Sequence, residues 1–320
     1  MSTAETITPL PLAAFREHIS TFYAEPMRAR NTRMKMLQVL RILDEMGVQT
    51  TADLTTTFIA RFIAERPKEE SPNTTFTLMT YLRSLCSQAA AEGWLRVSPF
   101  AIRRKWLRRV APKAPRHYSR EELARLLELA RREIGEVEQW AQWRARRLYA
   151  LAGTLAFTGL RKNEALHLRT EDIDLKARML LVLARRGHRL KTEASAAPVP
   201  IPDALAVILE EWQTHIIVPG WLFPTANGKS PWTGGVQGTK PLDQLKDLGR
   251  RAGIDGVTFQ GFRHSWATHA EHMGLSDLQI QRVLRHTNTR TQRHYLHPDA
   301  ANLRDQVGRM DFGPPGAAPQ

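Results

Sequence analysis

Apolar side chains recur along the first hundred residues with the spacing of an α-helix. The clearest repeats are Phe15, Ile19 and Phe22, followed by Met36, Leu37, Leu40 and Leu43. Intervals of three and four residues place such side chains on one face of a helix, where they can be buried together. The pattern therefore predicts helices between Ala13 and Arg66, after a flexible N-terminus at residues 1–12.

Polar residues and glycines mark where these helices begin and end. Thr51 or Asp53 is expected to cap the third helix, because both side chains can accept a bond from a backbone N–H. The fourth helix is expected to begin at Thr75, after a polar loop, and to end before Gly93. Helices of this number and length predict a small all-α domain at residues 13–110.

The remainder of the chain also has mainly the helical period. Ser119 and Glu122 have the spacing of a capping box, which opens a helix. Leu148–Phe157 is apolar on nearly every side, as in a buried central helix. Further helices are expected at Asp203–Thr214, Pro241–Ala252, His264–Met273 and Asp277–Leu284. The period changes at Met179–Leu183 and Pro198–Ile201, which predicts a pair of strands. We therefore expect a mainly α protein with a small antiparallel β-sheet.

A run of positive charge separates the two helical regions. The stretch 96–120 holds nine Lys or Arg, three Pro and no Asp or Glu. Proline stiffens such a segment, and unbalanced charge keeps it from packing alone. We interpret residues 111–118 as a basic linker, followed by a second domain at residues 119–312 and a flexible tail at residues 313–320.

The whole chain is basic. Its 320 residues include 46 Lys and Arg against 32 Asp and Glu, a formal net charge of +14. An excess of this size favours a polyanionic partner, and DNA or RNA fits better than a membrane. The longest apolar run, Leu148–Leu160, is shorter than the roughly 18 residues needed to cross a bilayer. The N-terminus lacks the basic start and apolar core of a secretory signal, so we expect a cytoplasmic protein.

Candidate phosphate contacts fall into two basic clusters. One lies in the second helix region and the other beside the linker: Arg28, Arg30, Arg33 and Lys35, then Arg103, Arg104, Lys105, Arg108 and Arg109. The first cluster fits a solvated helix face as well as a helix laid along a DNA backbone. The second fits a segment that crosses nucleic-acid phosphate. Neutralising several phosphates makes DNA affinity fall steeply as salt rises.

Cysteine and histidine usage bears on metal chemistry. The single cysteine, Cys86, excludes an internal disulfide and a Cys-based zinc site, and its apolar surroundings predict a buried residue. Six histidines gather near the C-terminus: His264, His269, His272, His286, His294 and His297. They form no HExxH pattern, so we expect no metal site.

The segment Gln260–Tyr295 combines side chains suited to a phosphodiester. It contains Arg263, His264, His286 and Tyr295. A guanidinium fork binds phosphate, an imidazole can share a proton, and a tyrosine hydroxyl can act as a nucleophile. These groups lie near the ends of two expected helices, where they can converge on one point. We therefore expect chemistry on nucleic-acid phosphate.

Three stretches of the chain resemble the tyrosine recombinases, the phage integrase family. FRHSWATH, at residues 262–269, resembles that family's second-arginine box. LRHTNTRTQRHY, at residues 284–295, is similar to its closing box, in which a His precedes the nucleophilic Tyr by nine residues. TGLRKNEAL, at residues 158–166, resembles its first-arginine box. The chain departs from the family at Gln260, where a His is usual.

This resemblance implies a catalytic set of six residues: Tyr295, Arg161, Lys191, Arg263, His286 and Gln260. Arg161 and Arg263 would neutralise the charge that builds on the phosphate. Lys191, between the two expected strands, would give a proton to the departing 5′ oxygen. Tyr295 would form a 3′-phosphotyrosyl link. Glu164 is better interpreted as a structural anchor of its turn than as an acid.

The resemblance also implies a function and partners. The N-terminal helices would form a core-binding domain, and the chain would be a site-specific recombinase or integrase acting on double-stranded DNA. Self-association as a tetramer on two DNA sites is expected, with accessory proteins as further partners. The phosphotyrosyl link stores the bond energy, so no metal, ATP or other cofactor is implied. Two alternatives stay open: a type IB topoisomerase, and a catalytically impaired DNA-binding protein of the same fold, consistent with Gln260.

Overall fold

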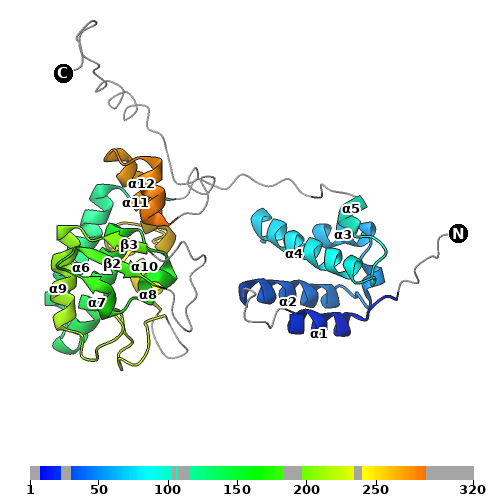
Figure 1. Ribbon diagram of the computed structural model, residues 1–320, viewed down its shortest axis with the longest axis horizontal. Coiled ribbons are helices and arrows are strands. Elements are labelled where there is room, and N and C mark those ends of the chain that lie inside the picture. The colour runs from blue at the N-terminus through cyan, green and yellow to red at the C-terminus, as the bar shows by residue number, and fades with distance from the viewer. Residues whose placement is uncertain are drawn as a thin grey trace, which may run out of the picture. The chain divides into compact units, whose positions relative to one another are not determined.

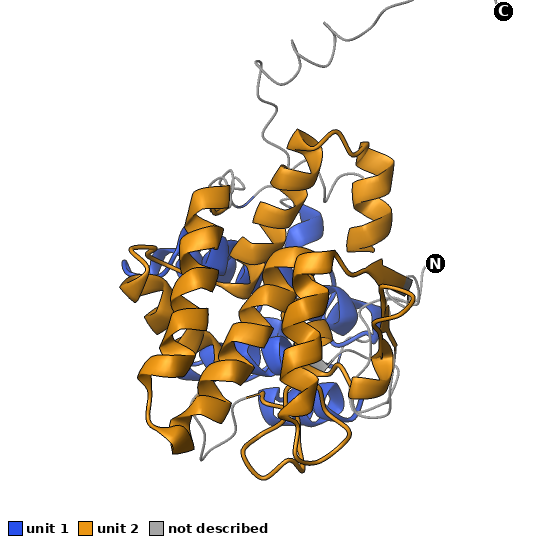
Figure 2. Ribbon diagram, turned by 90° about the vertical axis from the view of Figure 1, so that its left-hand side faces the viewer, with its two compact units in different colours: residues 1–112 blue, residues 113–320 orange. Residues whose placement is uncertain are grey.

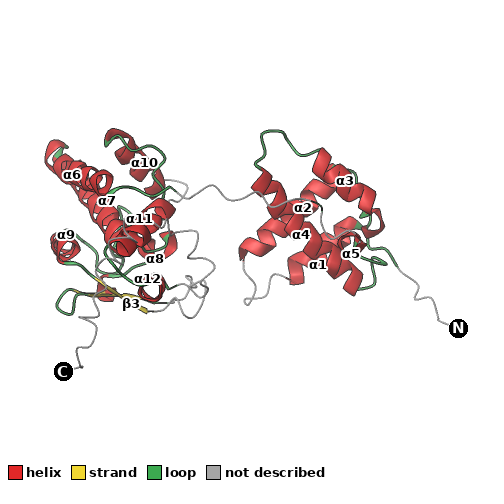
Figure 3. Cartoon of the chain, turned by 90° about the horizontal axis from the view of Figure 1, so that it is seen from above, coloured by secondary structure: helices red, strands yellow, loops and turns green. Residues whose placement is uncertain are grey.

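The computed structural model describes residues 8–22, 30–102, 106, 116–183, 197–233 and 240–285, with backbone alone at residues 30, 31 and 197. The chain divides into two compact units, residues 1–112 and residues 113–320 (Figure 2). Helices make up most of the described chain, with one three-stranded antiparallel sheet (Figure 3). The fold class predicted from the sequence is thereby confirmed. Within these ranges, no helix is long and apolar enough to cross a membrane.

Unit 1 is entirely helical in its described part. Its elements are α1 (Leu12–Phe22), α2 (Arg30–Glu45), the short η1 (Thr51–Asp53), α3 (Thr56–Ala64), α4 (Pro72–Ala91) and α5 (Pro99–Ile102). α2 packs between α1 and α4, and α5 covers the ends of α3 and α4 (Figure 1). The apolar faces predicted from the periodicity meet in one core, in which Phe15, Leu40 and Phe62 are fully buried.

The N-terminus is packed earlier than predicted. The backbone N–H of Leu10 donates to the Thr51 hydroxyl at 2.9 Å, and the carbonyl of Leu10 accepts from the Thr51 N–H. The Thr51 hydroxyl in turn donates to the carbonyl of Trp94 at 2.6 Å. The expectation of a flexible chain is therefore wrong for residues 8–12, because Thr51 bonds to Leu10, and residues 1–7 lie outside the described residues.

Two helix starts also differ from prediction. Thr55, not Thr51 or Asp53, caps α3 by accepting the Phe58 N–H at 3.1 Å. The Asp53 carboxylate closes the preceding η1 turn instead. α4 begins before Thr75, because Ser71 caps it and proline occupies its first turn, where no N–H is needed.

Cys86 is fully buried in α4, as the apolar pattern predicts. Burial raises the pKa of its thiol to about 12. Since the thiolate is the reactive form, this cysteine is inert at neutral pH in the folded protein.

Unit 2 is built around one long buried helix. Its helices are α6 (Arg120–Glu136), α7 (Gln139–Thr158), α8 (Lys162–Leu166), η2 (Thr170–Asp172), α9 (Asp203–Thr214), α10 (Pro241–Arg251), α11 (Phe259–His272) and α12 (Asp277–Leu284). α7 contacts α6, α8, α9, α10 and α11 (Figure 1). The apolar run at 148–157 is confirmed as a central helix, extended at its N-terminal end by a more polar stretch from Gln139.

The predicted strand pair is confirmed as β2 (Met179–Val182) and β3 (Ala197–Pro200), which pair antiparallel with Leu180 opposite Val199. A third strand, β1 (Ile173–Asp174), pairs with the other edge of β2. It is too short to show a period in the sequence. Leu180 and Val199 are buried, so this sheet closes one side of the unit 2 core.

The start of α11 is set by a contact with Tyr118, which the sequence places in the linker. Tyr118 is fully buried, and its hydroxyl accepts the Thr258 N–H at 2.8 Å. Thr258 caps α11, so the helix begins at Phe259, and the predicted start at His264 is wrong. Gly261 in the first turn leaves room for the tyrosine ring, because a Cβ there would lie 2.1 Å from its hydroxyl oxygen.

Candidate functional site

Three helix ends and one residue of a fourth helix lie together in unit 2. They are the C-terminus of α7 at Gly159, the start of α8 at Arg161, Arg263 in the second turn of α11, and the C-terminus of α12 at Arg285. Figure 1 shows α11 and α12 side by side, as their contacts require. The fold thus brings the two arginines predicted for phosphate contact into one cluster.

Glu164 is the shared acceptor of this cluster. Its Oε1 accepts from Nη1 of Arg161 at 2.7 Å, and its Oε2 accepts from the Arg161 backbone N–H at 2.8 Å. Nη2 of Arg285 donates to the same Oε2 at 2.5 Å, and Nη1 of Arg263 lies 4.0 Å from it. The Glu164 side chain is 5% exposed. It is a structural anchor, as its spacing from Arg161 predicts.

Arg263 joins the ends of two helices. Its side chain is 1% exposed. Nη1 donates to the carbonyl of Gly159 at 2.7 Å, and Nη2 donates to the carbonyl of Leu284, the last residue of α12. Carbonyls at helix C-termini carry partial negative charge and favour a cation. Arg263 is therefore held by the ends of α7 and α12 before any phosphate is present.

Gly159 is required where these helices meet. Its φ is 59°, the left-handed region that ends α7, and a Cβ there would lie 2.9 Å from Cδ2 of Leu284 and 3.1 Å from Trp266. Trp266 itself donates its indole N–H to the carbonyl of Phe157 at 2.9 Å. This partly buried tryptophan packs against the small core between α11 and α12, consistent with a core residue rather than a base-stacking one.

Arg161 is the more accessible of the two predicted arginines. Its side chain is 28% exposed. Nη2 lies 3.4 Å from the carbonyl of Arg285, which accepts its N–H. The backbone N–H of Arg161, which caps α8, donates to Glu164. The partly exposed guanidinium of Arg161 is therefore the more available group for an added anion.

The charge of Glu164 is maintained by its neighbours. Burial alone raises the pKa of this carboxyl, but the Arg285 charge and the bonds from Arg161 lower it more, and the net pKa lies below the usual range. Burial lowers the pKa of Arg285, which Glu164 partly offsets. Glu164 is thus ionised at neutral pH and cannot serve as a general acid.

We predict a stability loss for Glu164→Gln that depends on pH. Removing one partner of a buried ion pair costs about 3–5 kcal/mol of unfolding free energy. Because the folded pKa is depressed, this stabilisation is present above about pH 4.3, the usual pKa of glutamate, and is lost as pH falls through the folded value. Urea unfolding of parent and variant between pH 7 and pH 3 measures it. A gap that stays constant with pH would contradict an ionised Glu164.

Gln260 is exposed in the first turn of α11, between the buried Phe259 and Gly261. It precedes the buried Arg263 by three residues, which is about one helical turn. The N-terminal turn of a helix favours an anion through its backbone N–H groups and dipole. The phosphate contact expected of Gln260 stays a prediction.

Most other predicted site residues lie outside the described residues: Tyr295, His286, Lys191, Arg28, Arg103, Arg104, Lys105, Arg108 and Arg109. Arg30 has a described backbone only. Arg33 and Lys35 lie half-buried on α2, and Lys35 donates to Gln38 at 2.9 Å. The roles assigned to all these residues stay predictions.

Two of the C-terminal histidines are packed into unit 2, whereas His272 is exposed. His264 is buried in α11, and Nε2 of His269 bonds to the carbonyl of Tyr118 at 2.9 Å. Burial lowers the pKa of His269. In the part of the chain that the structure describes, which leaves out His286 and everything after it, no three His, Cys, Asp or Glu are grouped to hold a metal ion.

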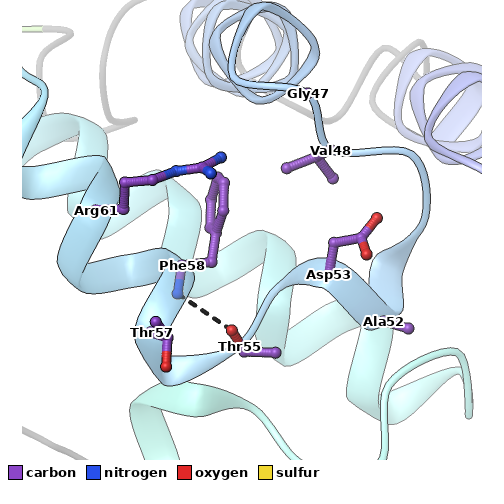
Figure 4. Close-up of a pocket in the computed structure, with 8 residues that line it drawn as sticks. All are labelled: Gly47, Val48, Ala52, Asp53, Thr55, Thr57, Phe58 and Arg61. Carbon is purple, nitrogen blue, oxygen red and sulfur yellow. Dashed lines mark hydrogen bonds between the residues drawn. The ribbon is translucent and has the colours of Figure 1, made fainter.

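A hollow of about 390 Å³ lies in unit 1 between the α2–η1 turn and α3 (Figure 4). Three of its polar side chains already have protein partners. Asp53 accepts from the Thr50 N–H, Thr55 caps α3, and Arg61 donates to the carbonyl of Met46. Arg161 and Arg263 belong to the other unit. This hollow therefore holds none of the predicted catalytic residues.

Sequence reasoning missed Arg285. Its side chain is 1% exposed, although it stands in a basic stretch that suggests solvent. The sequence held one sign of an unusual role: Arg285 directly follows the expected helix Asp277–Leu284, at a position where glycine is the usual residue. Only the fold shows that this position faces Glu164.

Comparison with known proteins agrees with this geometry. The sequence profile of the phage integrase family matches residues 119–302, more than half of the chain. The tyrosine recombinase XerA of Pyrococcus furiosus is 30% identical over 156 residues, 48% of this chain and 51% of that protein. Tyrosine recombinase XerD of Bradyrhizobium diazoefficiens is 30% identical over 202 residues, 60% of this chain and 62% of that protein. The chain thus spans about half to three fifths of the length of these relatives.

A solved structure shares the fold over nearly the whole chain. The Tn1549 transposon integrase, in complex with a circular intermediate DNA, superposes with a TM-score of 0.70 at 17% identity. The match covers 94% of this chain and 99% of that one. At 17% identity, this likeness shows a shared fold and nothing about function.

Proposed function

The chain belongs to the phage integrase family, and from that premise we propose that it is a site-specific recombinase that cuts and rejoins double-stranded DNA. The observation that carries the proposal is that Arg161 and Arg263 both lie within 4.0 Å of Glu164. Glu164 also bonds to Arg285, the residue directly before His286 in the chain. Two guanidinium groups at one point suit the charge of a phosphodiester transition state.

The reaction proposed has two transesterifications. The Tyr295 hydroxyl gives its proton to water and its oxygen attacks the phosphorus. The bond to the 5′ oxygen breaks, and Lys191 gives that oxygen a proton, which it regains from the attacking 5′ hydroxyl in the second step. His286 and Gln260 would contact the phosphate with the two arginines. The 3′-phosphotyrosyl link keeps the bond energy, so a 5′ hydroxyl of another strand can displace the tyrosine without ATP or metal. Preorganised positive charge favours both the phenolate nucleophile and the pentavalent phosphorus.

Recognition of DNA is assigned to unit 1 and the basic segment that follows it. The basic clusters at residues 28–35 and 103–109 would contact backbone phosphates, which position a protein on DNA without specifying its sequence. Exchange between two sites requires four active sites, so we expect a tetramer on two DNA duplexes, with accessory proteins as further partners.

Covalent capture of DNA from a fragment library tests this function. The protein is mixed with random genomic fragments and denatured, and the DNA that stays attached is recovered and its ends sequenced. We expect 3′ attachment and a shared sequence at the ends. DNA that binds but is never attached would favour a binding protein with impaired catalysis. Attachment at unrelated sequences, with relaxation of supercoils and no strand exchange, would favour a type IB topoisomerase.

Gln260 gives a graded prediction. Glutamine cannot take up a proton near neutral pH, but its amide can donate to a phosphate oxygen. Gln260→Ala is expected to slow single-turnover cleavage by about 10²-fold, the scale for one lost donor to the transition state. Gln260→His should preserve or raise the rate, because it restores the residue usual in the family. Cleavage by Gln260→Ala at the parent rate would show that Gln260 does not touch the phosphate.

A further inference from the structure

Arg285 has an unfavourable backbone conformation. Its φ is 55°, and only Arg178, at 54°, shares this left-handed conformation among the described residues other than glycine. The position ends α12, where glycine avoids the clash of a Cβ with the following carbonyl. A buried arginine at such a place needs compensating contacts.

Two contacts of Arg285 connect it to Arg161 and Arg263, and a third stays within its own turn. Its Nη2 donates to Glu164 at 2.5 Å, and its Nη1 donates to the carbonyl of Val283 at 2.9 Å. Its own carbonyl accepts from Arg161 at 3.4 Å, and Arg263 bonds to the preceding residue, Leu284. Arg285 therefore bonds both to Glu164, which Arg161 and Arg263 face, and, through its own carbonyl, to Arg161.

The charges of the cluster show what Arg285 changes. Glu164 carries one negative charge, and Arg161, Arg263 and Arg285 face it within 4.0 Å. Without Arg285, the carboxylate would offset half the positive charge of the two arginines intended for phosphate. In a buried site this matters, because charges interact strongly where water is excluded.

We propose that Arg285 is a positioning residue that takes up the charge of Glu164, so that Arg161 and Arg263 keep theirs for the scissile phosphate. It also fixes the last turn of α12 against the start of α8, directly before His286. This inference rests on the proposed function and adds a residue whose effect passes through Glu164 rather than through contact with DNA.

The test measures single-turnover cleavage of a nicked suicide duplex built on the recovered sequence. Arg285→Gly removes the charge while relieving the left-handed strain, and it should slow cleavage about 10- to 100-fold at saturating DNA, the scale of one nearby charge. DNA affinity should change less than about threefold, since no phosphate contact is lost. Arg285→Lys should keep most of the rate. Arg178→Gly is the matched control, because Arg178 has the same φ and pairs with Asp203 at 3.2 Å away from the cluster.

The double variant Glu164→Gln with Arg285→Gly separates charge from packing. Removing the carboxylate charge should make the double variant at least about threefold faster than Arg285→Gly alone, because Arg161 and Arg263 regain their full charge. A purely structural Arg285 would give a double variant no faster than Arg285→Gly. Either that result or an Arg285→Gly variant as fast as the parent overturns the inference while leaving the proposed function intact. A parent that forms no adduct overturns the proposed function, and this inference with it.

Discussion

Tyr295→Phe is expected to abolish the covalent DNA adduct while leaving DNA binding unchanged. Phenylalanine removes only the attacking oxygen, and loss of a nucleophile lowers a covalent reaction by roughly 10⁴-fold or more. The measurement is adduct formation on denaturing gels beside a binding titration at the same salt. Equal affinity is the control that the variant is folded and engaged.

Two other tyrosines are poor substitutes for Tyr295. Tyr118 is fully buried with its hydroxyl bonded at Thr258. Tyr149 is half-buried, and burial raises its pKa. Neither hydroxyl is suited to attack a phosphate at neutral pH. An adduct that persists in Tyr295→Phe would contradict this assignment and require a nucleophile elsewhere.

The second large effect is expected at the two arginines. Arg161→Ala and Arg263→Ala should each slow cleavage by about 10²–10³-fold, the scale for losing one preorganised donor to the transition state. Arg263→Ala should also destabilise the protein more than Arg161→Ala does. It leaves the buried carbonyls of Gly159 and Leu284 without their donor, at about 1–3 kcal/mol each.

Thermal unfolding beside single-turnover cleavage separates these contributions. Arg161→Ala should melt closer to the parent than Arg263→Ala, because its side chain is 28% exposed against 1%. Lysine variants act as controls that keep the charge and lose the planar fork. Parent-like cleavage by Arg161→Ala would remove Arg161 from the catalytic set.

The local pattern of the chain predicted what depends on local interactions. α12 lies at Asp277–Leu284 with Ser276 as its cap, and α6 follows the Ser119–Glu122 capping box, both as predicted. These signals involve residues three or four apart, so they are present in the sequence itself. The apolar run that forms α7 was recognised for the same reason.

Features that depend on distant partners were mispredicted or missed. α11 begins at Phe259 because Tyr118, far away in the chain, packs on Gly261 and bonds at Thr258. Thr51 was a predicted cap of α3, but its hydroxyl donates to the carbonyl of Trp94 instead. No periodicity encodes such contacts, since they arise only when separate elements pack together.

The candidate site shows the same division. The positions of Arg161 and Arg263 followed from their boxes, and Glu164 from its spacing to Arg161. The burial of Arg285 did not, because a basic residue in a basic stretch gives no local sign of a carboxylate on another helix. The sequence thus indicated that Arg161 and Arg263 belong together, but not that Arg285 joins them at Glu164.

The central claim is that Tyr295 attacks DNA phosphate in a site built on Arg161 and Arg263. The most direct test is to trim the recovered adduct with nuclease and map the modified peptide by tandem mass spectrometry. We predict a nucleotide joined through its 3′ phosphate to Tyr295. A nucleotide on any other residue, or joined through a 5′ phosphate, would contradict the account.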